Sequence, residues 1–269
     1  MLVIGENINA SNKSVGKAIS SRDREFLENL ARAQSAAGAD FIDVNVGAGQ
    51  GYNEQIEGAM EWLVEVVQGA TDKPLSIDSD VPSVVEVALR RYQGNALMIN
   101  SVSAEPERLD SIGRLAAERQ AYLVALAMGT EGIPNNVEER LAACELIMSH
   151  LTRLGLTEEQ VFFDPLVLPI SVDPTQGQVT LKTIEQIKSR YPSAKTVMGL
   201  SNISYGLPQR GMVNRAFLLM AAYAGLDAAI LNPLDAKTMS FVIVADMLTG
   251  KDPSCKGYLR AHRRGILVD

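Results

Sequence analysis

Several short apolar runs in the sequence end in a carboxylate or an amide side chain. Asp78 follows LSI, Asn100 follows LMI and Asp164 follows VFF. Clustered carboxylates and amides supply hydrogen-bond acceptors and donors. They suit a neutral heterocycle with several N–H groups better than a phosphate, which favours Lys, Arg or a glycine-rich turn. The residues that share this place in the pattern are Glu6, Asn7, Asn9, Asp43, Asn45, Asp78, Ser79, Asn100, Ser101, Asp164, Ser201, Asn202 and Asn232.

Some of these residues have a simpler alternative interpretation. An Asp or Ser after a strand is often the N-cap of the next helix, and Asp43 and Ser79 fit that role as well as they fit a site. Asp164 fits it less well, because Pro165 disfavours helical geometry there. Glycines 47, 49 and 51 of NVGAGQG resemble a phosphate-binding loop, but the full dinucleotide or Walker pattern is absent. We interpret them as a flexible loop between a strand and a helix.

The elements that must position these residues alternate between short strands and amphipathic helices. This alternation is typical of βα units around a parallel sheet. The expected strands cover residues 2–6, 41–46, 74–78, 96–101, 122–127, 161–165, 196–201 and 228–232. Eight units predict an α/β fold, a (β/α)8 TIM barrel whose strands end at one common mouth, and an open doubly wound sheet is the alternative. No linker divides the chain, so residues 1–269 are predicted to form a single domain.

Two helices can be placed by their own signals. Acidic residues in the segment 21–25 suit the start of a helix, which Ala37 and Gly38 can end. A second helix is predicted over residues 55–67. Its apolar residues recur on one face, which we interpret as core: Ile56, Met60, Leu63 and Val67.

The composition argues against several classes of protein. The net charge is −7 and the pI is about 5.0, so we expect no attraction to nucleic acid or to an anionic membrane. No apolar run has the length of a membrane span, and MLVIGENINA lacks the pattern of a signal peptide, so a cytoplasmic enzyme is expected. Cys144 and Cys255 lie far apart, and His150 and His262 have no partners at metal-ligand spacing. We therefore expect neither a disulfide framework nor a tightly bound metal.

Eight segments together carry a resemblance to a known family. They are IGENIN at 4–9, IDVNVG at 42–47, AMEWLVEVVQ at 59–68, IDS at 77–79, MINS at 98–101, DPLVLP at 164–169, TVMGLSNIS at 196–204 and NRAFLLMAAYAGLDAAILNP at 214–233. In order and spacing they resemble the methyltetrahydrofolate:corrinoid-protein methyltransferases. That family is related to the folate domain of cobalamin-dependent methionine synthase and belongs to the pterin-binding barrels. The resemblance covers nearly the whole chain.

The resemblance implies a methyl transfer between N5 of tetrahydrofolate and the cobalt of a corrinoid, either free cobalamin or one bound to a partner protein. Tetrahydrofolate or methyltetrahydrofolate is then the substrate, and the corrinoid is the methyl donor or acceptor. It also implies that Asp78, Asn100 and Asp164 hold the pterin ring, and that Asn202 approaches N5 as the catalytic residue. Further contacts around the rim are implied for Glu6, Asn9, Asp43, Asn45, Ser201 and Arg210.

Two alternative functions stay open on the sequence. Dihydropteroate synthases share the barrel and the pterin, although their phosphate-handling loops differ from ENINASNKSVGKA and VNVGAGQG here. A pterin-binding or corrinoid-docking protein without catalysis is the other alternative. The stretch 214–226 carries more apolar residues than one helix face buries, and with the resemblance it predicts a homodimer. Burial inside one barrel is the alternative explanation for that stretch.

Overall fold

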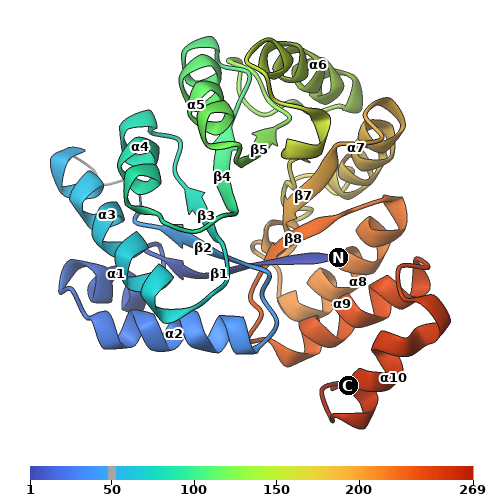
Figure 1. The fold of residues 1–269 in the computed structure, drawn as a ribbon. Coiled ribbons are helices and arrows are strands. Elements are labelled where there is room, and N and C mark those ends of the chain that lie inside the picture. The colour runs from blue at the N-terminus through green and yellow to red at the C-terminus, as the bar shows by residue number, and fades with distance from the viewer. Residues whose placement is uncertain (48–52, 269) are drawn as a thin grey trace.

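The computed structural model of the protein describes residues 1–47 and 53–268 and shows a closed barrel of parallel strands with helices around it (Figure 1). Each strand pairs with the next one in the sequence, and the last pairs with the first, Leu2 opposite Ala228 and Gly5 opposite Leu231. The strands are β1 (Leu2–Asn9), β2 (Phe41–Asn45), β3 (Leu75–Asp78), β4 (Leu97–Val102), β5 (Tyr122–Leu126), β6 (Val161–Asp164), β7 (Lys195–Gly199) and β8 (Ala228–Leu231). The predicted (β/α)8 barrel is confirmed.

The helices lie on the outside of the barrel (Figure 1). They are α1 (Lys13–Ser20), α2 (Arg24–Ala36), α3 (Asn53–Ala70), α4 (Pro82–Arg91), α5 (Pro106–Arg119), α6 (Val137–Arg153), α7 (Gln176–Arg190), α8 (Arg210–Ala224), α9 (Ala236–Leu248) and α10 (Lys256–Arg263). Short 3-10 helices add η1 (Glu158–Gln160), η2 (Leu200–Ser204) and η3 (Pro253–Cys255). The predicted strand over 196–201 is wrong at its end, because the chain leaves β7 at Gly199 and turns into η2.

The signals read for the second and third helices agree with the structure. The Asp23 side chain caps α2 by accepting from the Phe26 N–H, and Gly38 follows the helix with a φ of +102°. In α3, Met60, Leu63 and Val67 are fully buried, so the apolar stripe is core. Gly49 and Gly51 of the predicted flexible loop lie outside the described residues.

The barrel interior explains why polar residues follow apolar ones at the strand ends. Phe41, Met98 and Phe162 fill the interior together with Ile4, Val124, Val197 and Ala228. Side chains two positions apart in a strand point to the same face. Asp43, Asn100 and Asp164 stand two positions after Phe41, Met98 and Phe162, so they also face the interior, one layer nearer the mouth. The apolar layer is thus a floor beneath a polar layer.

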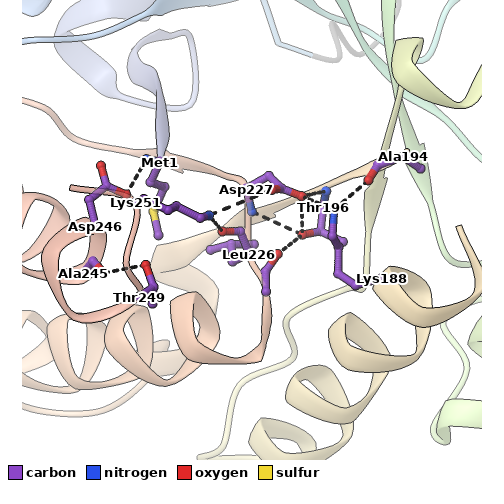
Figure 2. Close-up of polar contacts among 11 residues, drawn as sticks. Met1, Lys188, Ala194, Thr196, Leu226, Asp227, Ala245, Asp246, Thr249 and Lys251 are labelled. Carbon is purple, nitrogen blue, oxygen red and sulfur yellow. Dashed lines mark hydrogen bonds and ion pairs between the residues drawn. The ribbon is translucent and has the colours of Figure 1, made fainter. Parts of the chain in front are cut away.

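A polar network fixes the opposite end of the barrel, where strands begin (Figure 2). Asp227, just before β8, accepts hydrogen bonds from the Lys188 ammonium at 2.9 Å and from the Thr196 N–H at 3.0 Å. The N-terminal ammonium of Met1 pairs with Asp246 of α9 at 2.6 Å. These contacts tie β1, β7 and β8 to α7 and α9 at the end away from the mouth, so they position the scaffold and do not contribute to the mouth itself.

Candidate functional site

A cavity of about 690 Å³ opens at the carboxyl ends of the strands. This volume is within the usual range for a small-molecule site. Many of the residues singled out in the sequence line it: Glu6, Asn9, Asp43, Asp78, Asn100, Ser201 and Arg210. The barrel therefore brings together side chains that lie up to about 200 positions apart in the sequence, because parallel strands all end at the same mouth.

The carboxyl groups of Asp43 and Asp78 and the amide of Asn100 form the polar floor of the cavity, and Asn45, which does not line it, supports Asp78. The Asn45 amide donates to Asp78 Oδ2 at 2.7 Å, and the Asn100 amide donates to Asp43 Oδ1 at 3.2 Å. Burial raises the pKa of Asp43 well above its usual value, and the negative charge of Asp78 raises it further. Burial also raises the pKa of Asp78, while the Asn45 hydrogen bond opposes this. Since neighbouring buried carboxyl groups do not readily ionise together, the pair favours a shared proton.

The alternative role of Asp43 and Ser79 as helix N-caps is wrong. Asp43 lies inside β2 and is 2% exposed, so it belongs to the floor of the cavity. The Ser79 hydroxyl accepts from the Val81 N–H at 3.2 Å in the turn before α4, and the N-cap of α4 is Val81.

Asp164 ends β6 beside this floor but does not line the cavity itself. Its Oδ1 accepts from the Leu166 N–H at 2.8 Å. Leu166 has a φ of +66°, a left-handed conformation that costs a leucine on the order of 1–2 kcal/mol. Burial raises the pKa of Asp164 to about 6, and the Leu166 hydrogen bond and the charge of Arg140 oppose this rise. This carboxyl group can therefore change its protonation state near neutral pH.

Asn202 does not lie at the end of a strand. It stands in η2, is exposed, and does not line the cavity. Its neighbour Ser201 does line the cavity, and the Ser201 hydroxyl lies 3.4 Å from Glu6 Oε1. Arg210 holds the same turn by donating to the Ser201 carbonyl at 2.8 Å and to the Ser204 hydroxyl at 3.1 Å. The opening of β7 into a 3-10 turn thus gives Asn202 a place on the rim of the mouth.

Glu6 is the acidic group on β1, which lies beside β8 and is three strands along the closed barrel from Asp164 on β6. Burial raises the pKa of Glu6, while the Ser201 hydrogen bond and the positive charge of Arg210 lower it. Asn9, at the end of β1, accepts from the Ser11 N–H at 2.9 Å and turns the chain toward α1. Both residues line the cavity, but neither contacts Asp43 or Asp78 through a hydrogen bond within the described chain.

Part of the cavity lining was not predicted from the sequence. Asn12, the N-cap of α1, and Asn214 of α8 line the cavity, as do Asp235 and Thr238 around the start of α9. The side-chain oxygen of Asn214 is buried without a hydrogen-bond partner in the part of the chain that the structure describes. Asn12 could have been found from its position before KSVGKAIS. Asn214 carried no signal, because it lies in an apolar helix whose rotation about its axis the sequence does not determine.

Within residues 1–47 and 53–268, no cluster of three or more His, Cys, Asp or Glu side chains has an arrangement that could hold a metal ion. In the same residues, no helix combines the length and the apolar character needed to cross a membrane.

Similarity to known proteins shows which family this barrel resembles. Residues 5–232 match the family described as pterin binding enzyme. The chain is 33% identical over 267 residues to the methylcorrinoid:tetrahydrofolate methyltransferase of Eubacterium limosum, a match that covers 98% of this chain and 97% of that protein. It is 30% identical over 245 residues to the methionine synthase of Mycobacterium tuberculosis, which covers 86% of this chain but 20% of that protein.

A solved structure shows the same fold at low identity. The dihydropteroate synthase of Stenotrophomonas maltophilia, with imidazole bound in its active site, superimposes with a TM-score of 0.69 at 16% identity, covering 94% of this chain and 93% of that one. A likeness at this identity concerns the fold alone. The match to the family and the match along almost the full length of the Eubacterium protein go further, and they confirm the predicted resemblance: the chain belongs to the family of pterin-binding enzymes.

Proposed function

We propose that the protein moves a methyl group between a corrinoid and N5 of tetrahydrofolate. The observation that carries the proposal is the similarity along 98% of the chain to a protein named methylcorrinoid:tetrahydrofolate methyltransferase. The chemistry of the mouth supports it, because carboxylates and amides there are suited to the N–H groups and the carbonyl of a pterin. Asp78, Asn100 and Asp164 hold the pterin ring in this proposal, and Glu6, Asn9, Asp43, Asn45, Ser201 and Arg210 surround them.

The reaction needs a nucleophile, a methyl group that is transferred, and a group that exchanges one proton with N5. When tetrahydrofolate is methylated, the N5 lone pair forms the new bond to carbon, the carbon–cobalt bond breaks with its electron pair left on cobalt, and the N5 proton leaves. In the reverse direction N5 must gain a proton or a strong hydrogen bond as the carbon–nitrogen bond breaks, since an amide-like anion is a poor leaving group. The corrinoid supplies the metal as a substrate of the reaction.

Asn202 is the residue that we assign to N5. Its amide can donate an N–H to neutral N5 or accept from protonated N5, so it can stabilise both states of the nitrogen. Its exposure on the rim is compatible with a bulky corrinoid approaching from outside the barrel. Burial of the substrates around this amide strengthens its hydrogen bond, since the local dielectric constant falls.

The net charge and the exposed apolar residues bear on the proposed partners and assembly. The proposed macromolecular partner is a corrinoid protein, and the net charge of −7 disfavours nucleic acid. We propose a cytoplasmic location.

We also propose a homodimer, which the exposed apolar face of α8 supports. On this helix Phe217, Leu218 and Ala221 pack inward, while Met220 and Tyr223 are 54% and 86% exposed.

The dimer has a direct measurement. Tyr223→Glu places a charge on the outer face of α8 and removes apolar area, so we expect light scattering to give twice the monomer mass for the wild type and the monomer mass for the variant. Leu146→Glu makes the same kind of change at an exposed apolar residue of α6, away from α8, and is the control that should keep the wild-type mass. A wild type that stays monomeric at micromolar concentration removes the dimer.

The activity is tested with methylcobalamin and tetrahydrofolate, followed by cobalamin absorbance, and with cob(I)alamin and methyltetrahydrofolate in the reverse direction. Turnover in either direction supports the proposal. Tetrahydrofolate binding without turnover in both assays favours the non-catalytic pterin-binding or corrinoid-docking protein. Condensation of a dihydropterin pyrophosphate with p-aminobenzoate favours a dihydropteroate synthase.

A further inference from the structure

Arg140 is the largest side chain that this barrel buries completely. It stands in the first turns of α6, and the charge of its guanidinium group is satisfied in an unusual way. Within the described chain, each of its side-chain hydrogen bonds goes to a neutral oxygen: the carbonyls of Pro134, Pro165 and Leu166, the Thr180 hydroxyl and the Gln176 amide. Burying a charge without a hydrogen-bonded counter-ion is costly, so a gain elsewhere must explain this arrangement.

The closest contacts of Arg140 fall on the segment directly after Asp164. Its Nη1 donates to the Pro165 carbonyl at 2.7 Å and to the Leu166 carbonyl at 2.8 Å. Successive carbonyls of an extended chain point in opposite directions. The φ of +66° at Leu166 turns these two carbonyls toward one donor. The guanidinium group therefore stabilises a backbone conformation that leucine rarely adopts.

That conformation also directs a hydrogen bond at Asp164. The Leu166 N–H donates to Asp164 Oδ1 at 2.8 Å, and it belongs to the same peptide group as the Pro165 carbonyl that Arg140 holds. Thr180 of α7 donates to the Leu166 carbonyl at 2.9 Å, and Gln176 of α7 accepts from Arg140 Nη2 at 2.8 Å. Two neighbouring helices, α6 and α7 (Figure 1), thus hold the segment that fixes this carboxylate.

We propose that Arg140 is a positioning residue for Asp164: it holds the Pro165 and Leu166 carbonyls so that the Leu166 N–H fixes the carboxylate, and its buried charge favours the ionised form that accepts pterin N–H groups. This inference deepens the proposed function, because it rests on Asp164 binding the pterin. Arg140 is completely buried, so it acts on the ligand through Asp164.

Few charged groups surround Asp164, so the effect of Arg140 on the titration of this carboxyl group can be measured. From α6, the charge of Arg140 acts on Asp164. Burial raises the pKa of Cys144, also on α6, to about 12, and the charge of Asp164 adds to this rise, so that thiol is neutral. From α7, Gln176 and Thr180 are uncharged, and the adjacent strands β5 and β7 end in Leu126 and Gly199. Across the mouth stand the carboxyl groups of β1, β2 and β3. Arg140 is therefore the one cation acting on this carboxyl group among the described residues.

The test compares Arg140→Met, Arg140→Lys and a matched control. Arg119 of α5 also donates to two backbone carbonyls, those of Leu89 and Tyr92, but at the opposite end of the barrel. Arg119→Met therefore removes the same kind of contact away from the mouth. Each variant is checked for folding by thermal denaturation. Tetrahydrofolate affinity is measured by calorimetry across pH 5 to 8, and the Asp164 carboxyl is titrated by carbon NMR without ligand, with Asp164→Asn assigning the signal.

For Arg140→Met we expect a loss of roughly ten-fold or more in tetrahydrofolate affinity and a titration of Asp164 displaced to higher pH. Arg140→Lys keeps the charge but cannot reach both carbonyls and Gln176 together. It should keep the titration midpoint and lose several-fold in affinity, which also decides the matter if Arg140→Met does not fold. Arg119→Met should match the wild type in both readouts.

Several outcomes overturn the inference. Wild-type affinity and an unchanged Asp164 titration in folded Arg140→Met do so, as does wild-type affinity in Arg140→Lys or an equal loss in Arg119→Met. A wild-type protein that binds no tetrahydrofolate contradicts the proposed function instead, and the ligand-free titration of Asp164 still tests Arg140.

Discussion

At the scale of single residues, the mouth uses pairs of an acceptor and a donor. Asp78 is held by the Asn45 amide and Asp43 by the Asn100 amide, while Asp164 is held by a backbone N–H. Each carboxyl group keeps free acceptor positions after these bonds, since an ionised carboxylate can accept about four hydrogen bonds and a protonated one retains part of that capacity. A ligand that presents two adjacent N–H groups can therefore bind without displacing the internal network.

The first prediction concerns Asp164→Ala. A bound N–H group that loses its acceptor inside a closed site costs roughly 1–3 kcal/mol, which is about 5–150-fold in tetrahydrofolate affinity. Calorimetry measures this, with Asp80→Ala as control, because Asp80 is an exposed carboxylate near the mouth that pairs with Arg108. Wild-type affinity in the Ala variants at Asp78, Asn100 and Asp164 alike would show that the pterin binds elsewhere.

The second prediction concerns Asn202→Ala. If the amide stabilises N5 mainly while the bond to the methyl carbon forms or breaks, kcat/KM falls by about 10²–10³-fold and tetrahydrofolate affinity changes much less. Single-turnover kinetics separate the two effects. A normal chemical step in this variant would leave Asn202 as a structural member of η2. Asn202→Asp is a useful companion, because it retains an acceptor and removes the N–H donor.

At the scale of elements, the alternation of short apolar runs and amphipathic helical stretches predicted the barrel and the order of its strands well. It predicted the ends of the strands less well. The eight apolar runs specify eight strands because each must fill either the interior or the layer beneath the helices. The exit of β7 into η2 could not be predicted, since a local 3-10 turn has no periodic signal. The roles of Asn214 and Arg140 could not be predicted either. The sequence does not determine which face of α8 turns toward the cavity, and it does not distinguish a buried arginine in a helix from an exposed one.

The third prediction tests the packing of β1 against α2. A Cβ added at Gly5 would lie 2.5 Å from Gln34 Oε1 and 3.3 Å from Pro233. Gln34 is fully buried and accepts from the Asn7 N–H at 3.0 Å, so it cannot easily move. Gly5→Ala should lower the free energy of unfolding by about 1–3 kcal/mol, measured by urea denaturation.

Gly58 of α3 provides the matched control for that measurement. Apart from the backbone of its own helix, no atom of the described residues lies within 4 Å of a Cβ built there, and the residue is helical. Gly58→Ala should therefore be neutral or raise the free energy of unfolding by up to about 1 kcal/mol. Equal stability losses in both variants would mean that Gly5 has no special packing role, and that the β1 to α2 contact tolerates a methyl group.

At the scale of the whole molecule, the mouth is a region whose buried carboxyl groups lower the stability of the fold when they ionise. Its carboxyl groups are buried by the barrel that positions them, and burial raises the pKa values of Glu6, Asp43, Asp78 and Asp164. A folded-state pKa above the unfolded value means that the folded state binds more protons between the two values. The contribution of such a group to stability is present at low pH and is lost as the pH rises through the folded pKa.

The last prediction follows for Asp164→Asn, which keeps an oxygen to accept from the Leu166 N–H but cannot ionise. The wild-type carboxyl titrates at about 6 when folded, against 3.8 as the ordinary value, so its ionisation opposes folding above that window. The variant should gain on the order of 1–3 kcal/mol in the free energy of unfolding at pH 7.5, and the gain should shrink as the pH falls through 6 toward 4. Urea denaturation at several pH values measures this, and calorimetry should show weakened tetrahydrofolate binding in the same variant. A gain that is independent of pH would indicate better packing of the amide and would argue against an ionised Asp164 in the ligand-free mouth.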